Sequence, residues 1–204
     1  MLADVEFRDV LRRRRMVRAY DEDRPVPPDV IERLVRAAVR APSGGFVQGW
    51  GFLVLDAPED LERFREAATP ESDPDRWFAA NVRAPLIIVP HSNRSAYVAR
   101  YEQPDKGLDK RSDPSWPAPY WDIDAGFASM LVLLTAVDEG LGACFFGIPP
   151  ERIDDYRRAF GVPDEFRPIG AISIGYPAES ARDITADRKP LDEVVHRGRW
   201  NSAA

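Results

Sequence analysis

The sequence predicts a layered domain of the α+β or α/β class, built on a central sheet with helices packed against it. Short apolar runs alternate along the chain with amphipathic helical patterns, which is typical of such layers. The length of 204 residues fits one domain, and contents of 44% apolar and 30% charged residues are ordinary for a globular protein. We therefore expect residues 1–204 to form a single domain.

Apolar periodicity and capping residues predict the first elements. An i, i+3, i+4 apolar spacing indicates a short helix from Phe7. Asp29 and Glu32 have the spacing of a capping box, so we expect them to begin a second helix that ends near Ala41. The apolar run Trp50–Leu55 then predicts a buried strand.

The later elements follow from the same signals. They are helices near residues 59–67, 123–139 and 150–160, and strands at Leu86–Val89 and Ile169–Ile174. Gly140 and Gly161 suit the ends of the last two helices. A lone histidine at a strand end is usually structural, so we expect His91 to have no catalytic role. Cys144, in an apolar setting, is expected to be a small core residue.

Residues 91–121 predict a long irregular excursion. This segment is rich in proline, glycine and aspartate, and tyrosines and tryptophans are interleaved with them. Long loops inside compact domains are usually functional or disordered, and disordered segments contain few aromatic residues. We therefore expect a functional segment here.

Charge and cysteine content exclude several classes of function. The net charge is -6, from 34 acidic and 28 basic side chains, which does not favour a nucleic-acid or anionic-membrane partner. No apolar run approaches the roughly 18 residues of a membrane span, and the charged start is unlike a signal peptide. The single Cys144 forms no internal disulfide and no CxxC site. A cytoplasmic protein is expected.

The segment Ala41–Trp50 joins the second helix to the first strand and contains a candidate ligand-binding turn. Pro42 ends the helix, and Ser43 to Gly45 offer a bare backbone that a flat ligand can approach closely. Gln48 and Trp50 add an amide and an aromatic face. A tight turn without a ligand accounts for the proline and the glycines equally well.

The order of residues in Ala41–Trp50 resembles the Ala-Pro-Ser-x-x-Asn-x-Gln-Pro-Trp segment of the nitroreductase family. These are FMN enzymes in which this turn lies against the flavin ring. Phe46 stands where most members have asparagine, and Gly49 stands where they have proline.

Three further segments are similar to the same family in the same order. Arg14 to Tyr20 matches Arg-Arg-Ser-Val-Arg-x-Tyr with Met16 in place of serine, and in the family these basic residues hold the FMN phosphate and the pyrimidine edge. Gly140 to Gly147 matches a Gly-Leu-Gly turn and strand facing the flavin. Arg188 to Val195 matches Arg-x-Pro-Leu-x-Glu-Val, whose basic residue contacts the phosphate.

The resemblance implies an α+β fold with a central mixed sheet and a homodimer with intertwined C-terminal arms, in which a strand after Pro190 crosses to the partner subunit. It also implies that residues 91–121 form a lid on the substrate side of the flavin, where we expect Tyr120 and Trp121 to contact substrate. The residues that it assigns to the cofactor are Arg14, Arg15, Met16, Arg18, Pro42, Ser43, Gly44, Phe46, Gln48, Phe145, Phe146, Gly147, Arg188 and Lys189.

The function that the resemblance implies is flavin-based oxidation and reduction. NAD(P)H would reduce FMN, and a small acceptor such as a nitroaromatic or a quinone would reoxidise it. The chemistry then belongs to the flavin, so we expect no catalytic side chain and no metal site. The expected partners are a second copy of the chain and the small acceptor.

Two alternatives remain open. A Gly-Phe form of the turn is also found in the branch that makes dimethylbenzimidazole by fragmenting reduced FMN with oxygen. That branch has an aspartate at the position of Met16, and methionine cannot transfer a proton. The other alternative is a non-catalytic protein that binds a flavin or a deazaflavin, because Phe46 and Met16 both lack the family's polar contacts to the ring.

Overall fold

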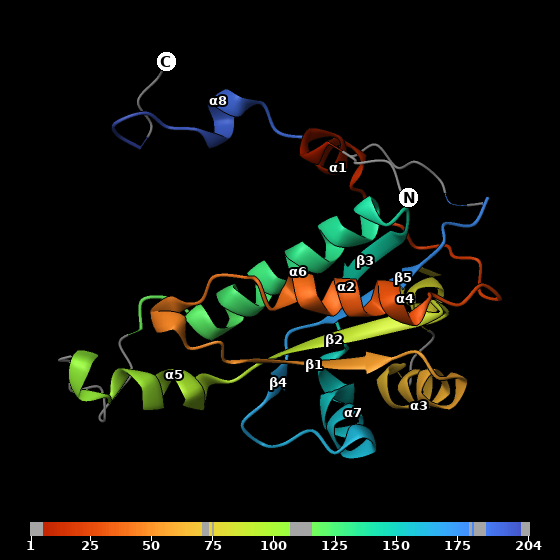
Figure 1. Cartoon of the computed structure of the whole chain (residues 1–204), viewed down its shortest axis with the longest axis horizontal. Helices are drawn as coiled ribbons and strands as arrows, with labels where there is room; N and C mark the ends of the chain where they lie inside the picture. Colours follow the sequence, from red (N-terminus) through yellow and green to blue (C-terminus); the bar gives the residue numbers. More distant parts are fainter. Residues whose placement is uncertain are drawn as a thin grey trace.

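The computed structural model describes residues 6–70, 74, 76–106, 116–179, 181 and 187–200. Helices cover both faces of one sheet (Figure 1), so the predicted α+β layering is confirmed. The strands are β1 (Trp50–Leu55), β2 (Leu86–Ser92), β3 (Gly142–Phe146), β4 (Arg167–Pro168) and β5 (Ala171–Gly175). Their order across the sheet is β1-β2-β5-β3, with β4 paired to the end of β2.

Each strand pair within the described sheet is antiparallel. β2 pairs with β1 through Leu53 and Val89 and with β5 through Ile87 and Ser173. The expected mixed sheet is therefore wrong for these strands. The parallel element is an isolated bridge between Met16 and Ala143, which adds the arginine-rich segment to the free edge of β3.

Two helices, α2 (Pro28–Ala38) and α6 (Tyr120–Asp138), cover one face of the sheet. Leu34 and Val132 pack with Ile88 and Ile174 in one buried cluster. By length and composition alone α6 could cross a membrane, but in this structure its buried side lies against α2 and the sheet. It is thus the central helix of the domain.

The other face of the sheet is covered by α3 (Pro58–Ala68) and α7 (Ile153–Phe160). Phe64 and Tyr156 pack edge to face, with ring centroids 5.9 Å apart, above Ile87 and Val89. Because neighbouring residues of β2 point to opposite faces, Ile87 and Ile88 belong to different clusters. The central strand therefore joins both halves of the core.

The remaining helices lie at the edges of these layers. They are α1 (Phe7–Arg13), α4 (Arg76–Asn81), α5 (Arg94–Tyr101), α8 (Leu191–Val194) and the short 3-10 helices η1 (Gly44–Phe46), η2 (Pro104–Lys106) and η3 (Pro150–Arg152). In Figure 1, α8 and residues 195–200 extend away from the body of the domain, beyond α1.

Three expectations about local structure are wrong. Asp29 does not cap α2: the N-cap is Pro27, and Asp29 lies inside the first turn, where it pairs with Arg33 at 2.9 Å. The helix also ends at Ala38 rather than Ala41, because the last residues form turns instead. The strand expected after Pro190 begins as the helix α8.

The predicted excursion at residues 91–121 is partly regular. Its first half contains α5, whose N-cap Asn93 accepts a hydrogen bond from the Ala96 N–H at 2.9 Å. Its end forms the first turn of α6, which begins at Tyr120. Residues 107–115 of the predicted lid lie outside the described residues.

Candidate functional site

The arginine-rich segment is fixed to the sheet along β3. Beyond the Met16–Ala143 bridge, the Val17 N–H donates to the Ala143 carbonyl at 3.0 Å. The buried Tyr20 hydroxyl lies 2.8 Å from Ser173 Oγ on β5. Gly142 allows this close approach, since a Cβ there would lie 2.7 Å from Val17 Cβ. The fold therefore presents the arginines from a rigid edge rather than from a free loop.

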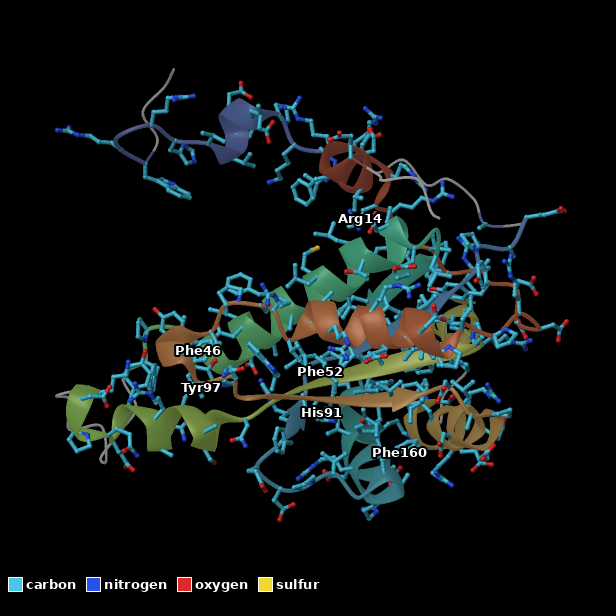
Figure 2. The ribbon with its side chains drawn as sticks, viewed as in Figure 1. Arg14, Phe46, Phe52, His91, Tyr97 and Phe160 are labelled. Carbon is cyan, nitrogen blue, oxygen red and sulfur yellow. The ribbon has the colours of Figure 1, made fainter. Side chains whose placement is uncertain are left out.

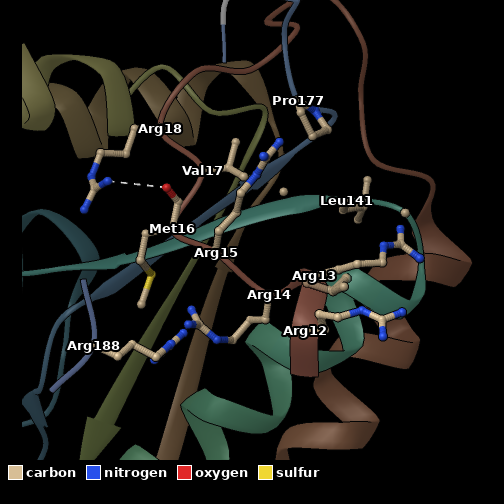
Figure 3. A pocket seen from close by; sticks show the side chains of 13 residues that line it. Arg12, Arg13, Arg14, Arg15, Met16, Val17, Arg18, Leu141, Pro177 and Arg188 are labelled. Atoms are coloured by element: carbon tan, nitrogen blue, oxygen red, sulfur yellow. Dashed lines mark hydrogen bonds between the residues drawn. The ribbon is translucent and has the colours of Figure 1, made fainter. Parts of the chain in front are cut away.

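These arginines line a cavity of about 880 Å³ at the C-terminal end of α6 (Figure 3). We call it the arginine cavity. Its lining residues are Arg12, Arg13, Arg14, Arg15, Met16, Val17, Arg18, Val137, Gly140, Leu141, Gly142, Pro177 and Arg188. Among the described lining residues are six arginines and no carboxylate, so this part of the cavity is strongly positive and suited to a phosphate-bearing ligand.

The six arginines differ in the ion pairs, hydrogen bonds and ring contacts that their side chains form within the protein. Arg12 pairs with Asp9 on α1, and Arg18 donates to the Met16 carbonyl at 3.4 Å, while its guanidinium lies 5.1 Å from the Trp77 ring centroid. Arg14 and Arg188 form no ion pair with the described residues. Figure 3 shows both side chains extending toward the same space. These two are the best placed to bind an anion.

Part of the predicted cofactor-binding set lies together in this region. The structure brings Arg14, Arg15, Met16, Arg18 and Arg188 together in one cavity. Eight lining residues were not assigned to the cofactor from the sequence, although Val17 and Gly140 to Gly142 belong to the segments quoted there: Arg12, Arg13, Val17, Val137, Gly140, Leu141, Gly142 and Pro177. Most of these residues lie in or next to the segments that resemble the family motifs. The motifs therefore indicated the region of the cavity, but the residues assigned to the cofactor covered too little of it.

The residues expected from β3 do not line the cavity. Phe145 packs against the α2–α6 side of the core, and Phe146 packs against the α3–α7 side, 6.4 Å from the Phe64 ring centroid. Gly147 follows the strand and is exposed. Lys189, next to Arg188, is also exposed and outside the lining. Contact with the cavity occurs earlier on this segment, at Leu141 and Gly142.

Residues 43–48 form a compact turn around η1, which we call the glycine turn. Gly45, Phe46 and Gln48 all have positive φ values, of 61°, 54° and 52°. Such conformations are uncommon for residues other than glycine and indicate a constrained backbone. Ser43 Oγ accepts from the Gln48 N–H at 3.0 Å, while the Phe46 side chain is 76% exposed.

The glycine turn and the arginine cavity lie at opposite ends of α6 (Figure 2, Phe46 and Arg14). The Gly44 N–H donates to Asp124 Oδ2 at 2.7 Å, near the start of α6, whereas Val137, near its end, lines the cavity. Val137 lies 13 positions after Asp124, which corresponds to about 20 Å along the helix. Within one chain, Pro42 to Gln48 are therefore not brought to the arginines.

Tyr120 and Trp121 lie on the same side as the glycine turn. They belong to an aromatic cluster in which Trp116 contacts Tyr97, Tyr101, Tyr120 and Trp121, with ring centroids 4.8–6.3 Å apart. Edge-to-face contacts of this kind are favourable beyond the area that they bury. The cluster connects α5 to the first turn of α6 and lies beside Gly45, whose Cβ position is 3.1 Å from Tyr101.

Two buried groups lie outside both parts of the site. His91 is buried, and burial lowers the pKa of its imidazole, so the ring is neutral at pH 7. Its Nε2 lies 3.0 Å from the Tyr156 hydroxyl. Burial also raises the pKa of the Cys144 thiol. Neither residue lines the arginine cavity, so both fit the structural roles predicted for them.

Comparison with known proteins shows which family this chain is similar to. The family model described as the nitroreductase family matches residues 11–176. A protein of Methanothermobacter thermautotrophicus, named an NADH dehydrogenase/NAD(P)H nitroreductase, is 30% identical over 205 residues, covering 98% of this chain and 90% of that protein.

Solved structures are similar over nearly the same length. A nitroreductase of Exiguobacterium sibiricum in complex with FMN superposes with a TM-score of 0.75, at 21% identity, over 94% of this chain and 97% of that one. An NADH oxidase of Clostridium acetobutylicum gives a TM-score of 0.69 at 27% identity, over 94% of this chain and 100% of that one.

Proposed function

This chain belongs to the nitroreductase family, and from that premise we propose that it is an FMN-dependent oxidoreductase that takes a hydride from NAD(P)H and reduces a small acceptor such as a nitroaromatic or a quinone. The observation that supports FMN most directly is the arginine cavity. Its six arginines, which no carboxylate accompanies among the lining residues that the structure describes, suit a phosphate of charge about −1.5 to −2.

Each part of the site has a separate task in this proposal. Arg14 and Arg188 would hold the FMN phosphate through bidentate hydrogen bonds, because neither is engaged by a carboxylate of the described residues. Leu141 and Gly142 bring backbone beside the same cavity. When bound, FMN supplies the hydride-accepting chemistry, and the protein binds it, orients it and excludes water from it.

A homodimer completes the site. Phe127 and Met130 on α6 are 49% and 45% exposed, a large apolar surface for a central helix. A second copy packed on this face could bring its glycine turn to the arginine cavity, which one chain alone cannot do. The Phe46 ring, projecting from that turn, would then lie against the flavin of the other subunit.

The acidic net charge and the family match also support a cytoplasmic protein with a small-molecule acceptor and neither nucleic-acid nor membrane partners. Of the two open alternatives, flavin fragmentation is disfavoured because Met16, which lines the cavity, can neither donate nor accept a proton. Its thioether offers polarisable contact only.

Anaerobic titration of the FMN-loaded protein tests the proposal. We expect NADH or NADPH to bleach the flavin absorbance, and a nitroaromatic or a quinone to restore it. Oxygen-dependent loss of the flavin itself, with a new benzimidazole product, would instead support the fragmenting enzyme. If the bound flavin is not reduced by either nicotinamide, the protein is a flavin-binding module rather than an oxidoreductase.

A further inference from the structure

We propose that Tyr97 and Asp124 are positioning residues that lock the glycine turn in its binding conformation, replacing the rigid proline that this chain lacks at Gly49. This inference rests on the proposed function, because the turn must serve the flavin for its shape to matter. It assigns a role to two residues that the sequence patterns did not single out.

Asp124 holds the turn from α6. Its carboxylate is buried, with the residue 4% exposed, and Oδ2 accepts both the Gly44 N–H at 2.7 Å and the Tyr97 O–H. A hydrogen bond to a charged acceptor is among the stronger contacts in proteins. This one carboxylate oxygen on α6 accepts a hydrogen bond from α5 and another from the glycine turn. It therefore connects three segments of the chain.

Tyr97 holds the turn from α5. Its ring is fully buried, with 0% exposure, and it packs edge to face with Trp116 and Trp121 at 6.3 and 6.1 Å. Burial, with the hydrogen bond to Asp124, raises the pKa of this hydroxyl, which therefore stays protonated and remains a donor. The aromatic cluster thus holds the Tyr97 ring in place, and the Tyr97 hydroxyl in turn holds the Asp124 carboxylate.

Gly49 is explained by the same ring. A Cβ at this position would lie 2.8 Å from Tyr97 Cε2 and 3.1 Å from the Asn93 carbonyl, so neither alanine nor proline fits without displacement. Proline here would also restrict Gln48, whose φ of 52° is outside the extended region that a residue before proline prefers. In this chain Tyr97 therefore occupies space that a proline at position 49 would need.

The backbone of the glycine turn is constrained and needs contacts from neighbouring elements to keep its shape. Three residues with positive φ, two of them not glycine, persist only where surrounding contacts hold them. Besides Asp124, the Arg100 guanidinium donates to the Gly45 carbonyl at 3.2 Å. Without these contacts the turn would adopt other backbone conformations, and the exposed Phe46 side chain would no longer be held in one orientation.

Four variants test the inference with FMN as the probe. Tyr97→Phe removes one hydrogen bond and keeps the ring, and Asp124→Ala removes the acceptor. Asp124→Asn keeps an oxygen that can accept both bonds. Ser129→Ala is the matched control, because among the described residues this buried hydroxyl on α6 bonds within the helix, to the Ala125 carbonyl. The measurements are the FMN dissociation constant, the visible circular dichroism of bound FMN and the melting temperature of the flavin-free protein.

We expect FMN affinity to fall roughly tenfold or more for Asp124→Ala and about threefold to tenfold for Tyr97→Phe, with altered dichroism at full saturation. Asp124→Asn should recover most of the affinity, and Ser129→Ala should match the wild type. If Asp124→Ala fails to fold, Tyr97→Phe decides.

Unchanged affinity and dichroism in Tyr97→Phe would overturn the inference while leaving the proposed function intact. So would a lowered melting temperature with wild-type FMN binding, since the network would then be structural only. A wild-type protein that binds no FMN would overturn the proposed function itself, which makes the two failures distinguishable.

Discussion

At the scale of single residues, charge is the dominant feature of this protein. Arginines 12–15, 18 and 188 gather at one cavity although the whole chain carries a net charge of -6. The sequence pattern identified this group well, because arginine is the side chain best suited to a phosphate and the run lies beside the first helix. It could not indicate which arginines already have partners, since those contacts depend on tertiary structure.

Removal of Arg14 is predicted to weaken FMN retention by about tenfold or more, because a hydrogen bond to a charged group contributes roughly 1.5–3 kcal/mol. Equilibrium dialysis or fluorescence titration of Arg14→Ala measures it. Arg36→Ala is the control, since this exposed arginine on α2 pairs with Glu32 away from the cavity. Equal FMN affinity in Arg14→Ala and the wild type would contradict the assignment.

His91 should make stability depend on pH. Burial lowers the pKa of the folded imidazole below its ordinary value of about 6.5, so the unfolded chain binds a proton that the folded chain does not. The free energy of unfolding should therefore fall as pH drops below about 6.5 toward the folded pKa. Urea unfolding between pH 7.5 and 5.5 measures this slope.

His91→Gln is the comparison for that measurement, because glutamine can bond to the Tyr156 hydroxyl and does not titrate. Its loss of stability over the same pH range should be smaller. A slope identical to that of the wild type would mean that other groups cause the pH dependence.

At the scale of elements, the sequence predicted those whose cause is local and missed those whose cause is tertiary. Apolar patterning identified α6 and β2, because the residues that face the core recur at helical spacing in α6 and form a continuous run in β2. The segment of α5 appeared irregular because its residues pack in the aromatic cluster instead of forming a simple apolar stripe. Asp29 matched a capping box, but Pro28 at the first helical position set the start of α2 two residues earlier.

The contact between β3 and the arginine segment gives a prediction at this scale. Gly142→Ala would place a methyl group 2.7 Å from Val17 Cβ, so the segment must move and the Val17–Ala143 hydrogen bond must lengthen. We expect the free energy of unfolding to fall by about 1–3 kcal/mol, as in overpacked cores, and FMN affinity to fall with it. Thermal unfolding and FMN titration measure the two effects.

Gly126→Ala is the control for Gly142→Ala. Open space surrounds its Cβ position within helix α6, where alanine is favoured over glycine by up to about 1 kcal/mol. This variant should be as stable as the wild type or more stable. A similar loss in both variants would show that the close approach at Gly142 is not the cause.

At the scale of the whole molecule, the candidate site is divided. The sequence placed the arginine segment and the glycine turn in one flavin site, yet about 20 Å of α6 lies between their attachment points in a single chain. Sequence spacing alone cannot show this separation, because it carries no information about which contacts form between subunits. The resemblance to a dimeric family was therefore needed to connect the two parts.

The exposed apolar surface favours that dimer and gives the last prediction. Phe127 and Met130 on α6 are accompanied by exposed Leu191 and Trp200 in the C-terminal arm, which lies away from the body of the domain. Exposed large apolar side chains that gather on one surface often mark a protein–protein interface. A charge buried in such an interface without a partner costs several kcal/mol, so Phe127→Glu with Met130→Glu should prevent association.

We expect the wild type to sediment as a dimer at micromolar concentration, and the double variant to be monomeric or poorly soluble and unable to retain FMN. Deleting residues 194–204 should impair FMN retention as well, if the arm crosses to the second subunit. Arg63→Glu is the matched control, because it places a new negative charge on α3, across the sheet from α6. A monomeric wild type that binds FMN tightly would contradict the shared site, since one chain would then supply every contact that the flavin requires.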